Sequence, residues 1–234
     1  EKIAAYPNNA FLYNLMAQVN LAEKKPEAAE AALKQAIQLA PQWNVPYDNL
    51  ARLYLSQGKT ARAIDNMQDA IDRNPKNTTA YMTLAFLYEK SGDPGKAKAV
   101  YEAALNKNDR LWAAANNLAF LLAEHPDSSD DLQRASELAA QAEKLRPNEP
   151  RVLDTVGWIH YRKGDLTKAL TVMERAVEKA PDSGVINYHA ARVLADSGRM
   201  VEAREKLEKT LVADGDFAEK AEAEALLEKI VNSE

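Results

Sequence analysis

Three histidines, His125, His160 and His189, are the side chains of this sequence best suited to metal binding or proton transfer. Together with Asp154, the pair His160 and His189 offers metal ligands, because imidazole and carboxylate groups commonly bind Zn²⁺. The sequence contains no HExxH helix, zinc-finger spacing, phosphate-binding glycine loop or nucleophile motif. Aspartate and glutamate are numerous, but their distribution indicates solvated outer helix faces. We therefore expect no catalytic residue, no cofactor and no metal, and for His160 a packing role.

The composition excludes several other classes of function. The 234 residues carry a net charge of −5, and no basic patch of the kind that binds nucleic acid is present. No apolar run reaches the roughly 18 residues that a membrane span requires, so we expect no direct membrane insertion. The sequence has no cysteine, which excludes disulfides and thiolate metal sites. Good helix formers predominate and nothing indicates a strand.

Prolines recur at a fixed spacing and indicate regular helix boundaries. Pro7, Pro41 and Pro75 are 34 residues apart, and Pro147 and Pro181 continue the pattern. Because proline stops the preceding helix, each one marks the start of a new repeat. The predicted repeats cover 10–43, 44–77, 78–111, 112–149, 150–183 and 184–217. Residues 1–9 are interpreted as the remnant of a preceding repeat, and 218–234 as a C-terminal capping helix.

Small residues occupy three fixed positions of each repeat, counted from its first residue. Position 8 is alanine or glycine, position 20 is alanine, and position 27 is alanine except for Thr210. A small side chain lets two helices pack at roughly 8–10 Å. Glycine recurs at position 15, where it permits the left-handed backbone that ends a helix. Four extra residues around 124–131 of the fourth repeat predict a longer surface loop, or alternatively a local change in pitch or a lateral contact.

This pattern resembles the tetratricopeptide repeat (TPR) family over nearly the whole chain. The resemblance implies an all-α solenoid, in which antiparallel helix pairs stack into a right-handed superhelix with a concave inner surface. It also implies a non-enzymatic scaffold that binds a protein or peptide. The Lys/Asn clamp of chaperone-binding TPR domains is not reproduced, which argues against recognition of a chaperone C-terminus.

By resemblance, the first helix of each repeat lines the groove, and its inward positions supply the candidate binding residues. Amides suit a peptide backbone because they both donate and accept hydrogen bonds, and exposed aromatics beside arginine are typical of interface hot spots. The candidates are Asn14, Gln18, Asn49, Arg52, Met82, Phe86, Asn116, Asn117, Phe120, Arg151, Trp158, Tyr161, Arg162, Tyr188 and Arg192. Trp158 is expected to face the groove. Phe86 and Phe120 either face it or pack between neighbouring helices.

Phrases such as NNLAFLLAEHPD and VLDTVGWIHYRKGDLTKAL look like the C-terminal part of bacterial TPR lipoproteins of envelope and exopolysaccharide systems, including those linked to exosortase (PEP-CTERM) sorting. This resemblance implies a multiprotein bacterial system. It favours the periplasm, with a lipid anchor upstream of residue 1, over the cytoplasm. Two rival functions stay open. One is a self-assembling array, a homo-oligomer formed through exposed repeat ends, and the other is a substrate-positioning module of a larger enzyme.

Overall fold

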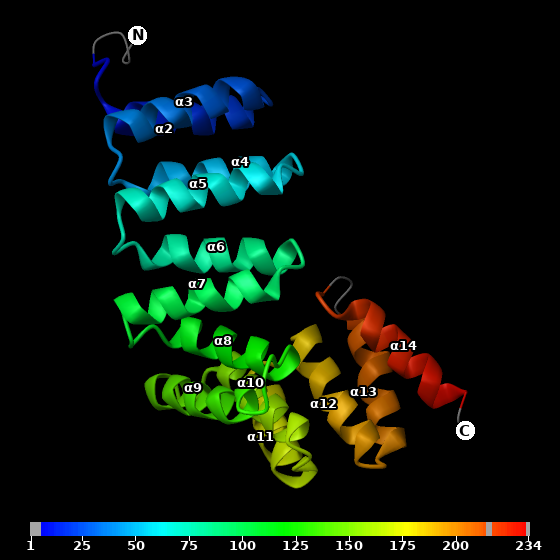
Figure 1. Ribbon diagram of the computed structural model, residues 1–234. Coiled ribbons are helices and arrows are strands. Elements are labelled where there is room, and N and C mark those ends of the chain that lie inside the picture. The colour runs from blue at the N-terminus through cyan, green and yellow to red at the C-terminus, as the bar shows by residue number, and fades with distance from the viewer. Residues whose placement is uncertain (1–5, 214–216, 233–234) are drawn as a thin grey trace. The chain divides into compact units, whose positions relative to one another are not determined.

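The structure, a computed structural model, describes residues 6–213 and 217–232. Within those ranges it contains thirteen α-helices and no strand (Figure 1). The helices are α2 (Ala10–Ala22), α3 (Pro26–Leu39), α4 (Asn44–Ser56), α5 (Thr60–Arg73), α6 (Thr78–Lys90), α7 (Pro94–Lys107), α8 (Trp112–Glu124), α9 (Asp131–Leu145), α10 (Pro150–Arg162), α11 (Leu166–Lys179), α12 (Gly184–Asp196), α13 (Met200–Ala213) and α14 (Lys220–Val231). The predicted all-α class is confirmed. Of the remnant of a preceding repeat predicted at residues 1–9, residues 1–5 lie outside the described residues.

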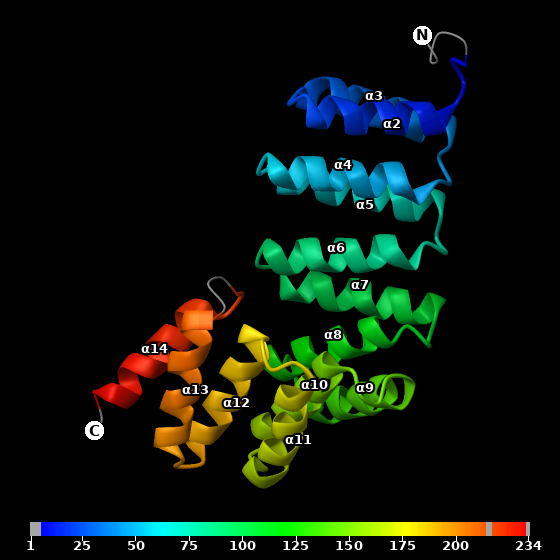
Figure 2. The same cartoon turned by 180° about the vertical axis from the view of Figure 1, so that it is seen from behind.

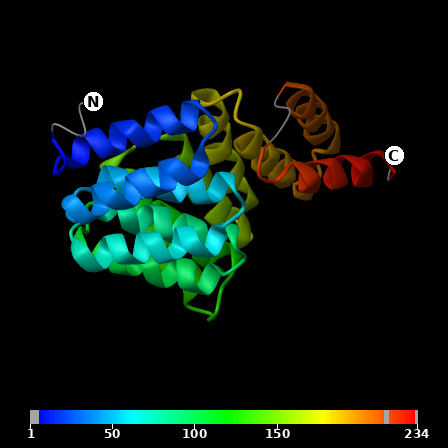
Figure 3. The same ribbon diagram turned by 90° about the horizontal axis from the view of Figure 1, so that it is seen from above.

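The chain divides into two compact units, residues 1–109 and 110–234, and each is described by itself. In the N-terminal unit the hairpins α2/α3, α4/α5 and α6/α7 stack in chain order, as two opposite views show (Figures 1 and 2). Seen along the stack, these hairpins lie over one another (Figure 3). In the C-terminal unit α8/α9, α10/α11 and α12/α13 form the hairpins, and α14 packs on α12 and α13. Each predicted repeat thus contains one pair of helices.

Local sequence fixes where the helices begin and end. Asn9, Asp93 and Asp165 accept hydrogen bonds from backbone N–H groups in the first turn of the helix that follows, and each such cap contributes roughly 1 kcal/mol. Glycines at repeat position 15 adopt φ values from 70° to 82° after the first helix. The first repeat has Lys24 at this position, with φ 57°. Because a side chain is strained in this region, glycine is the expected residue there.

The small residues of the repeat lie in the interior of the hairpins. At position 20, Ala29, Ala63 and Ala97 in the N-terminal unit are 0% exposed, and so are their counterparts Ala135, Ala169 and Ala203 in the C-terminal unit. A larger side chain at these positions would force the paired helices apart. The three-position pattern therefore indicates the hairpin core in both units.

The inserted segment of the fourth repeat forms an exposed loop, residues 125–130, between α8 and α9. The loop is held by Asp131, whose carboxylate accepts hydrogen bonds from Asp127 N at 2.6 Å and from Ser128 Oγ at 2.8 Å. Glu124, which the sequence assigned to the insert, is instead the last residue of α8. No helix in the described part of the chain is long and apolar enough to cross a membrane.

Candidate peptide-binding surface

In the N-terminal unit, the first helices α2 and α4 bring four of the predicted binding residues together. Asn49 Nδ2 donates to Asn14 Oδ1 at 2.8 Å, and Arg52 Nη2 donates to Asn49 Oδ1 at 2.8 Å. Asn14 is buried, Asn49 is half-buried, and Arg52 and Gln18 are exposed. The buried amide of Asn14 thus orients Asn49, which in turn holds the guanidinium of Arg52 at the surface. Asn14 was expected to be exposed in the groove, but it is buried and hydrogen-bonded to Asn49.

An open hollow of about 260 Å³ lies beside this hydrogen-bonded chain. Its apolar lining includes Ala17, Leu33 and Leu53, all at most 4% exposed. The remaining lining residues are Gln18, Leu21, Asn49, Arg52 and Ser56. An apolar floor with a few polar groups around it is the usual composition of a ligand site. We name these eight residues the α2/α4 hollow.

Asp48 adds a carboxylate to the same helix face. Burial raises the pKa of the Asp48 carboxyl group, and the positive charge of Arg52 partly opposes that shift. Its Oδ1 atom is buried and, among the described residues, has no hydrogen-bond partner. An acceptor in this state favours a donor brought by a ligand or by water.

Two further candidates lie on α6. The Phe86 side chain is 47% exposed, and the Lys90 ammonium lies 5.7 Å from the centre of its ring. Met82 is half-buried. Of the two alternatives left open for Phe86, the structure shows the exposed one. Phe86 is thus available to a ligand of the N-terminal unit.

In the C-terminal unit the predicted aromatic anchors are largely internal, so the expectation that Trp158 is exposed is wrong. Trp158 and Tyr188 are each only 7% exposed, and Phe120 and Tyr161 are half-buried. The rings gather around His189. The distance from the His189 ring centre to that of Trp158 is 4.3 Å, to that of Tyr188 5.6 Å, and to that of Phe120 5.7 Å. We name Phe120, Trp158, Tyr161, Tyr188 and His189 the aromatic cluster. Its rings pack on one another and so give the C-terminal unit a filled core.

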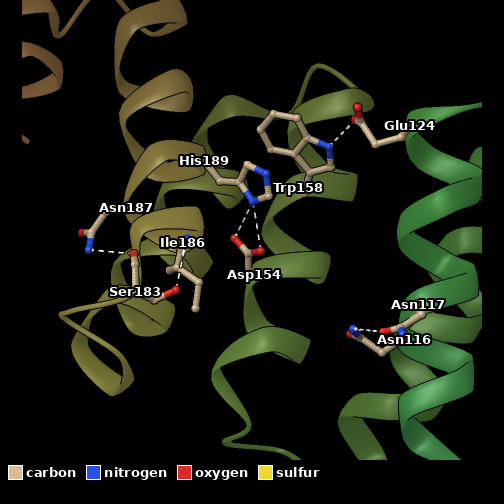
Figure 4. A network of polar contacts seen from close by, with 9 residues as sticks. All are labelled: Asn116, Asn117, Glu124, Asp154, Trp158, Ser183, Ile186, Asn187 and His189. Atoms are coloured by element: carbon tan, nitrogen blue, oxygen red, sulfur yellow. Dashed lines mark hydrogen bonds and ion pairs between the residues drawn. The ribbon is translucent and has the colours of Figure 1, made fainter. Parts of the chain in front are cut away.

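At the centre of the aromatic cluster His189 pairs with Asp154 (Figure 4). Its Nδ1 atom lies 2.9 and 3.0 Å from the two carboxylate oxygens of Asp154, and both residues are buried. Burial by itself lowers the pKa of His189, but the charge and hydrogen bond of Asp154 outweigh it, and the pKa is raised. Asp154 is therefore an exception to the expected outer placement of acidic residues.

A metal site built on this pair finds no support. Among the described residues no three His, Cys, Asp or Glu side chains are grouped so that they could hold an ion. His160 is half-buried, and burial lowers its pKa. His189 and Asp154 instead form an ion pair. They are 35 residues apart, so they occupy neighbouring positions of successive 34-residue repeats, and this spacing would have indicated their contact.

Two carboxylates bind the polar edges of the aromatic cluster. Glu124 accepts hydrogen bonds from Trp158 Nε1 and, at 2.6 Å, from Arg162 Nη1. Asp196 accepts one from the Tyr161 hydroxyl at 2.5 Å and one from Arg192 Nε at 3.4 Å. Arg162 and Arg192 thus anchor the cluster. The repeat pattern alone does not indicate these carboxylate partners.

The last three candidates lie apart from the aromatic cluster's ring contacts. Asn116 is buried, its Nδ2 lies 3.4 Å from Asn117 Oδ1, and its own Oδ1 has no hydrogen-bond partner in the described chain (Figure 4). The exposed Arg151 guanidinium lies 5.3 Å from the centre of the Trp112 ring. Their role in binding stays a prediction.

Comparison with known proteins places most of the chain in repeats of one type. Family models described as tetratricopeptide repeat match residues 12–42, 54–118, 127–184 and 160–230. A TPR repeat-containing protein of Pseudomonas aeruginosa is 43% identical over 51 residues, which make up 22% of this chain and 9% of that protein. The matched segment thus spans about a tenth of that relative.

Solved structures share the fold at low sequence identity. A tetratricopeptide repeat protein from Parabacteroides merdae has a TM-score of 0.76 at 18% identity, over 96% of this chain and 86% of that one. The Cut9–Hcn1 hetero-tetramer of the APC/C has a TM-score of 0.72 at 14% sequence identity, over 98% of this chain and 44% of that one. YrrB is described as a TPR protein with an unusual peptide-binding site. It has a TM-score of 0.55 at 22% sequence identity, over 83% of this chain and 98% of that one.

Proposed function

Because this chain belongs to the tetratricopeptide repeat family, we propose that it is a non-enzymatic scaffold that binds a peptide segment, and that the binding surface of its N-terminal unit lies on α2 and α4. Proteins of this fold generally act in protein–protein interactions. The observation that supports the location is the chain of hydrogen bonds from Asn14 through Asn49 to Arg52 beside the α2/α4 hollow. These hydrogen bonds hold polar groups in a fixed orientation at the surface.

The arrangement suits an extended peptide for two physical reasons. Half-buried Asn49 and exposed Gln18 offer amide groups that can donate to and accept from a peptide backbone. Arg52 is already held by Asn49, so little side-chain freedom is lost when a ligand binds. The neighbouring hollow accepts an apolar side chain. YrrB, which shares the fold, is described as having a peptide-binding site, and this is consistent with the proposal.

Selection from a random peptide library tests this function. We expect the intact protein to enrich a set of peptides. Asn49→Ala together with Arg52→Ala should weaken their binding at least tenfold, since two directed hydrogen-bonding groups are lost. Gln68→Ala with Arg73→Ala on α5 is the matched control, because it removes the same number of amide and cationic groups from a second helix. Equal weakening by both variants, or no enrichment at all, would contradict the proposal.

The partner system stays a prediction from sequence. We place the protein in a bacterial multiprotein assembly, with the envelope and periplasm favoured on the resemblance to TPR lipoproteins of exopolysaccharide and sorting systems. The short match to the Pseudomonas protein supports the repeat type alone. A substrate-positioning role within a larger enzyme likewise stays a prediction.

Self-assembly is a second candidate function, and one observation favours it. Phe11, Leu15 and Val19 follow one another at four-residue steps on α2 and are 61%, 45% and 50% exposed. This helix contains no charged residue, so an apolar stripe faces solvent without repulsion between copies. Light scattering over a concentration series tests it. A mass that rises with concentration and returns to that of one chain in Leu15→Glu supports self-assembly, whereas a constant mass excludes it.

A further inference from the structure

The α2/α4 hollow has a counterpart at the same repeat positions in the C-terminal unit. The hollow is lined by positions 8, 9, 12 and 24 of one repeat and by positions 6, 9, 10 and 13 of the next. In the fifth and sixth repeats these positions hold Gly157, Trp158, Tyr161 and Met173, followed by His189, Arg192, Val193 and Asp196. The two sets of residues thus form the same step between successive repeats.

In the C-terminal unit aromatic rings occupy that step. Trp158 replaces Gln18 at position 9, and its ring stacks on His189, which stands where Asn49 does (Figure 4). Tyr161 replaces the 39% exposed Leu21 at position 12, and its ring centre lies 4.8 Å from that of Trp158. Gly157 at position 8 packs closely on α11, because a Cβ atom added there would lie 3.0 Å from Met173 Cγ.

We propose that the α2/α4 hollow receives an aromatic side chain of the bound peptide, which lies there as Trp158 lies in the C-terminal unit. The inference rests on the proposed peptide-binding function and names the kind of residue that the peptide brings. In the fifth and sixth repeats the protein's own aromatic side chains occupy this step. In the first and second repeats a side chain of the peptide takes that place.

Size and charge both agree with an aromatic guest. A cavity of roughly 150 Å³ is enough to bind benzene, and the hollow measures about 260 Å³. Arg52 stands at the position of Arg192, whose Nε donates to Asp196, the carboxylate that also accepts from the Tyr161 hydroxyl. Among the described residues Arg52 forms no salt bridge, and Asn49 Oδ1 holds its Nη2 atom. An exposed guanidinium attracts the face of a nearby aromatic ring.

The probe for this site is N-acetyl-tryptophanamide, compared with N-acetyl-leucinamide. In the isotope-labelled full chain, we expect the tryptophan probe to shift the side-chain amide signals of Gln18 and Asn49 in a saturable way. The leucine probe should bind at least fivefold more weakly, because it lacks a ring for Arg52. Arg52→Gln should reduce the preference for tryptophan over leucine to within about twofold.

A filling variant tests the site against non-specific binding. Gln18→Trp restores the residue found at this position in the fifth repeat, and we expect it to abolish the saturable shift at Asn49. Gln68→Trp adds the same side chain to the outer helix α5 and should leave binding unchanged. If Gln18→Trp lacks the helical content of the parent chain, Leu21→Tyr, which copies Tyr161, serves as the filling variant.

Three results would overturn the inference: no saturable shift, equal affinity for the two probes, or full binding by a folded filling variant. Its failure can be separated from failure of the proposed function. Selected peptides that depend on Asn49 and Arg52 but contain no aromatic residue would leave peptide binding intact and remove the aromatic guest. Binding of the tryptophan probe without any selected peptide would do the reverse.

Discussion

His189 Nδ1 lies 2.9 Å from the nearer carboxylate oxygen of Asp154, at the same two repeat positions where Asn49 is hydrogen-bonded to Asn14. In both cases the partners are 35 residues apart and come from the first helices of successive repeats. One step of the fold therefore uses a neutral amide pair, and another uses an ionisable pair inside an aromatic cluster. The neutral pair supplies a natural replacement for testing the charged one.

Replacing one member of the buried ion pair should destabilise the C-terminal unit. Asp154→Asn leaves the His189 imidazole without its carboxylate, and we expect a loss of about 3 kcal/mol in the free energy of unfolding. The double variant Asp154→Asn with His189→Asn copies the Asn14–Asn49 pair, and should be about 1 kcal/mol more stable than the single variant, because no unpaired imidazole remains although the ring contacts of His189 are lost. Urea unfolding measures both. A double variant no more stable than the single one would contradict the equivalence of the two pairs.

The stability of the C-terminal unit should fall as the pH rises. The folded state raises the pKa of His189 above its unfolded value of about 6.5. The stabilisation from its proton is therefore complete below about pH 6.5, and is lost as the pH rises through the folded-state pKa. The other charged groups acting on His189 are Asp154 of α10, Glu124 of α8 and Glu219, which precedes α14. All three carboxylates favour the protonated imidazole.

Urea unfolding between pH 6 and pH 9, followed through the amide signals of α12, measures this dependence, and the signals of α4 serve as an internal reference. The double asparagine variant should show a flatter profile in α12. If α4 and α12 lose stability equally with pH, the effect does not arise from His189.

Trp158→Ala should destabilise the protein through its core. Because Trp158 is buried against His189 and Tyr161, its removal leaves a cavity, and we expect a loss of about 3 kcal/mol in the free energy of unfolding. Phe86→Ala removes an exposed aromatic ring and should cost less than about 0.5 kcal/mol. Thermal and urea unfolding distinguish the two. Equal small losses would mean that the aromatic cluster does not support the unit.

Exchanging the residues at repeat position 15 should change stability in opposite directions. Lys24 adopts φ 57°, so Lys24→Gly relieves backbone strain, and we expect a gain of about 0.5 kcal/mol. Gly58 adopts φ 70°, and an added Cβ would contact nothing within 4 Å. The cost of Gly58→Lys is therefore conformational, about 1 kcal/mol. Chemical denaturation of both single variants checks the signs, and changes of the same sign would refute the explanation.

Local sequence signals define the repeat. The period between prolines, the alanines at positions 8, 20 and 27 and the glycines at position 15 act within one hairpin, where contacts between nearby residues decide helix ends and close packing. They predicted paired helices, and the resemblance to the tetratricopeptide repeat family implied the all-α solenoid. The structural role of these residues can be predicted without knowledge of the neighbouring repeats.

The exposure of the inward residues depends on packing between successive repeats. Gln18 and Trp158 share position 9, yet Gln18 is exposed beside a hollow and Trp158 is buried. The difference arises from residues 31 positions further on, where His189 stacks on the indole of Trp158 and Asn49 leaves space beside Gln18. Helical periodicity predicts which face of the helix a side chain lies on, but not the size of the residue of the next repeat that packs against it. That partner is set by packing between successive repeats, so exposure at the inner wall depends on pairs of residues that no local pattern joins.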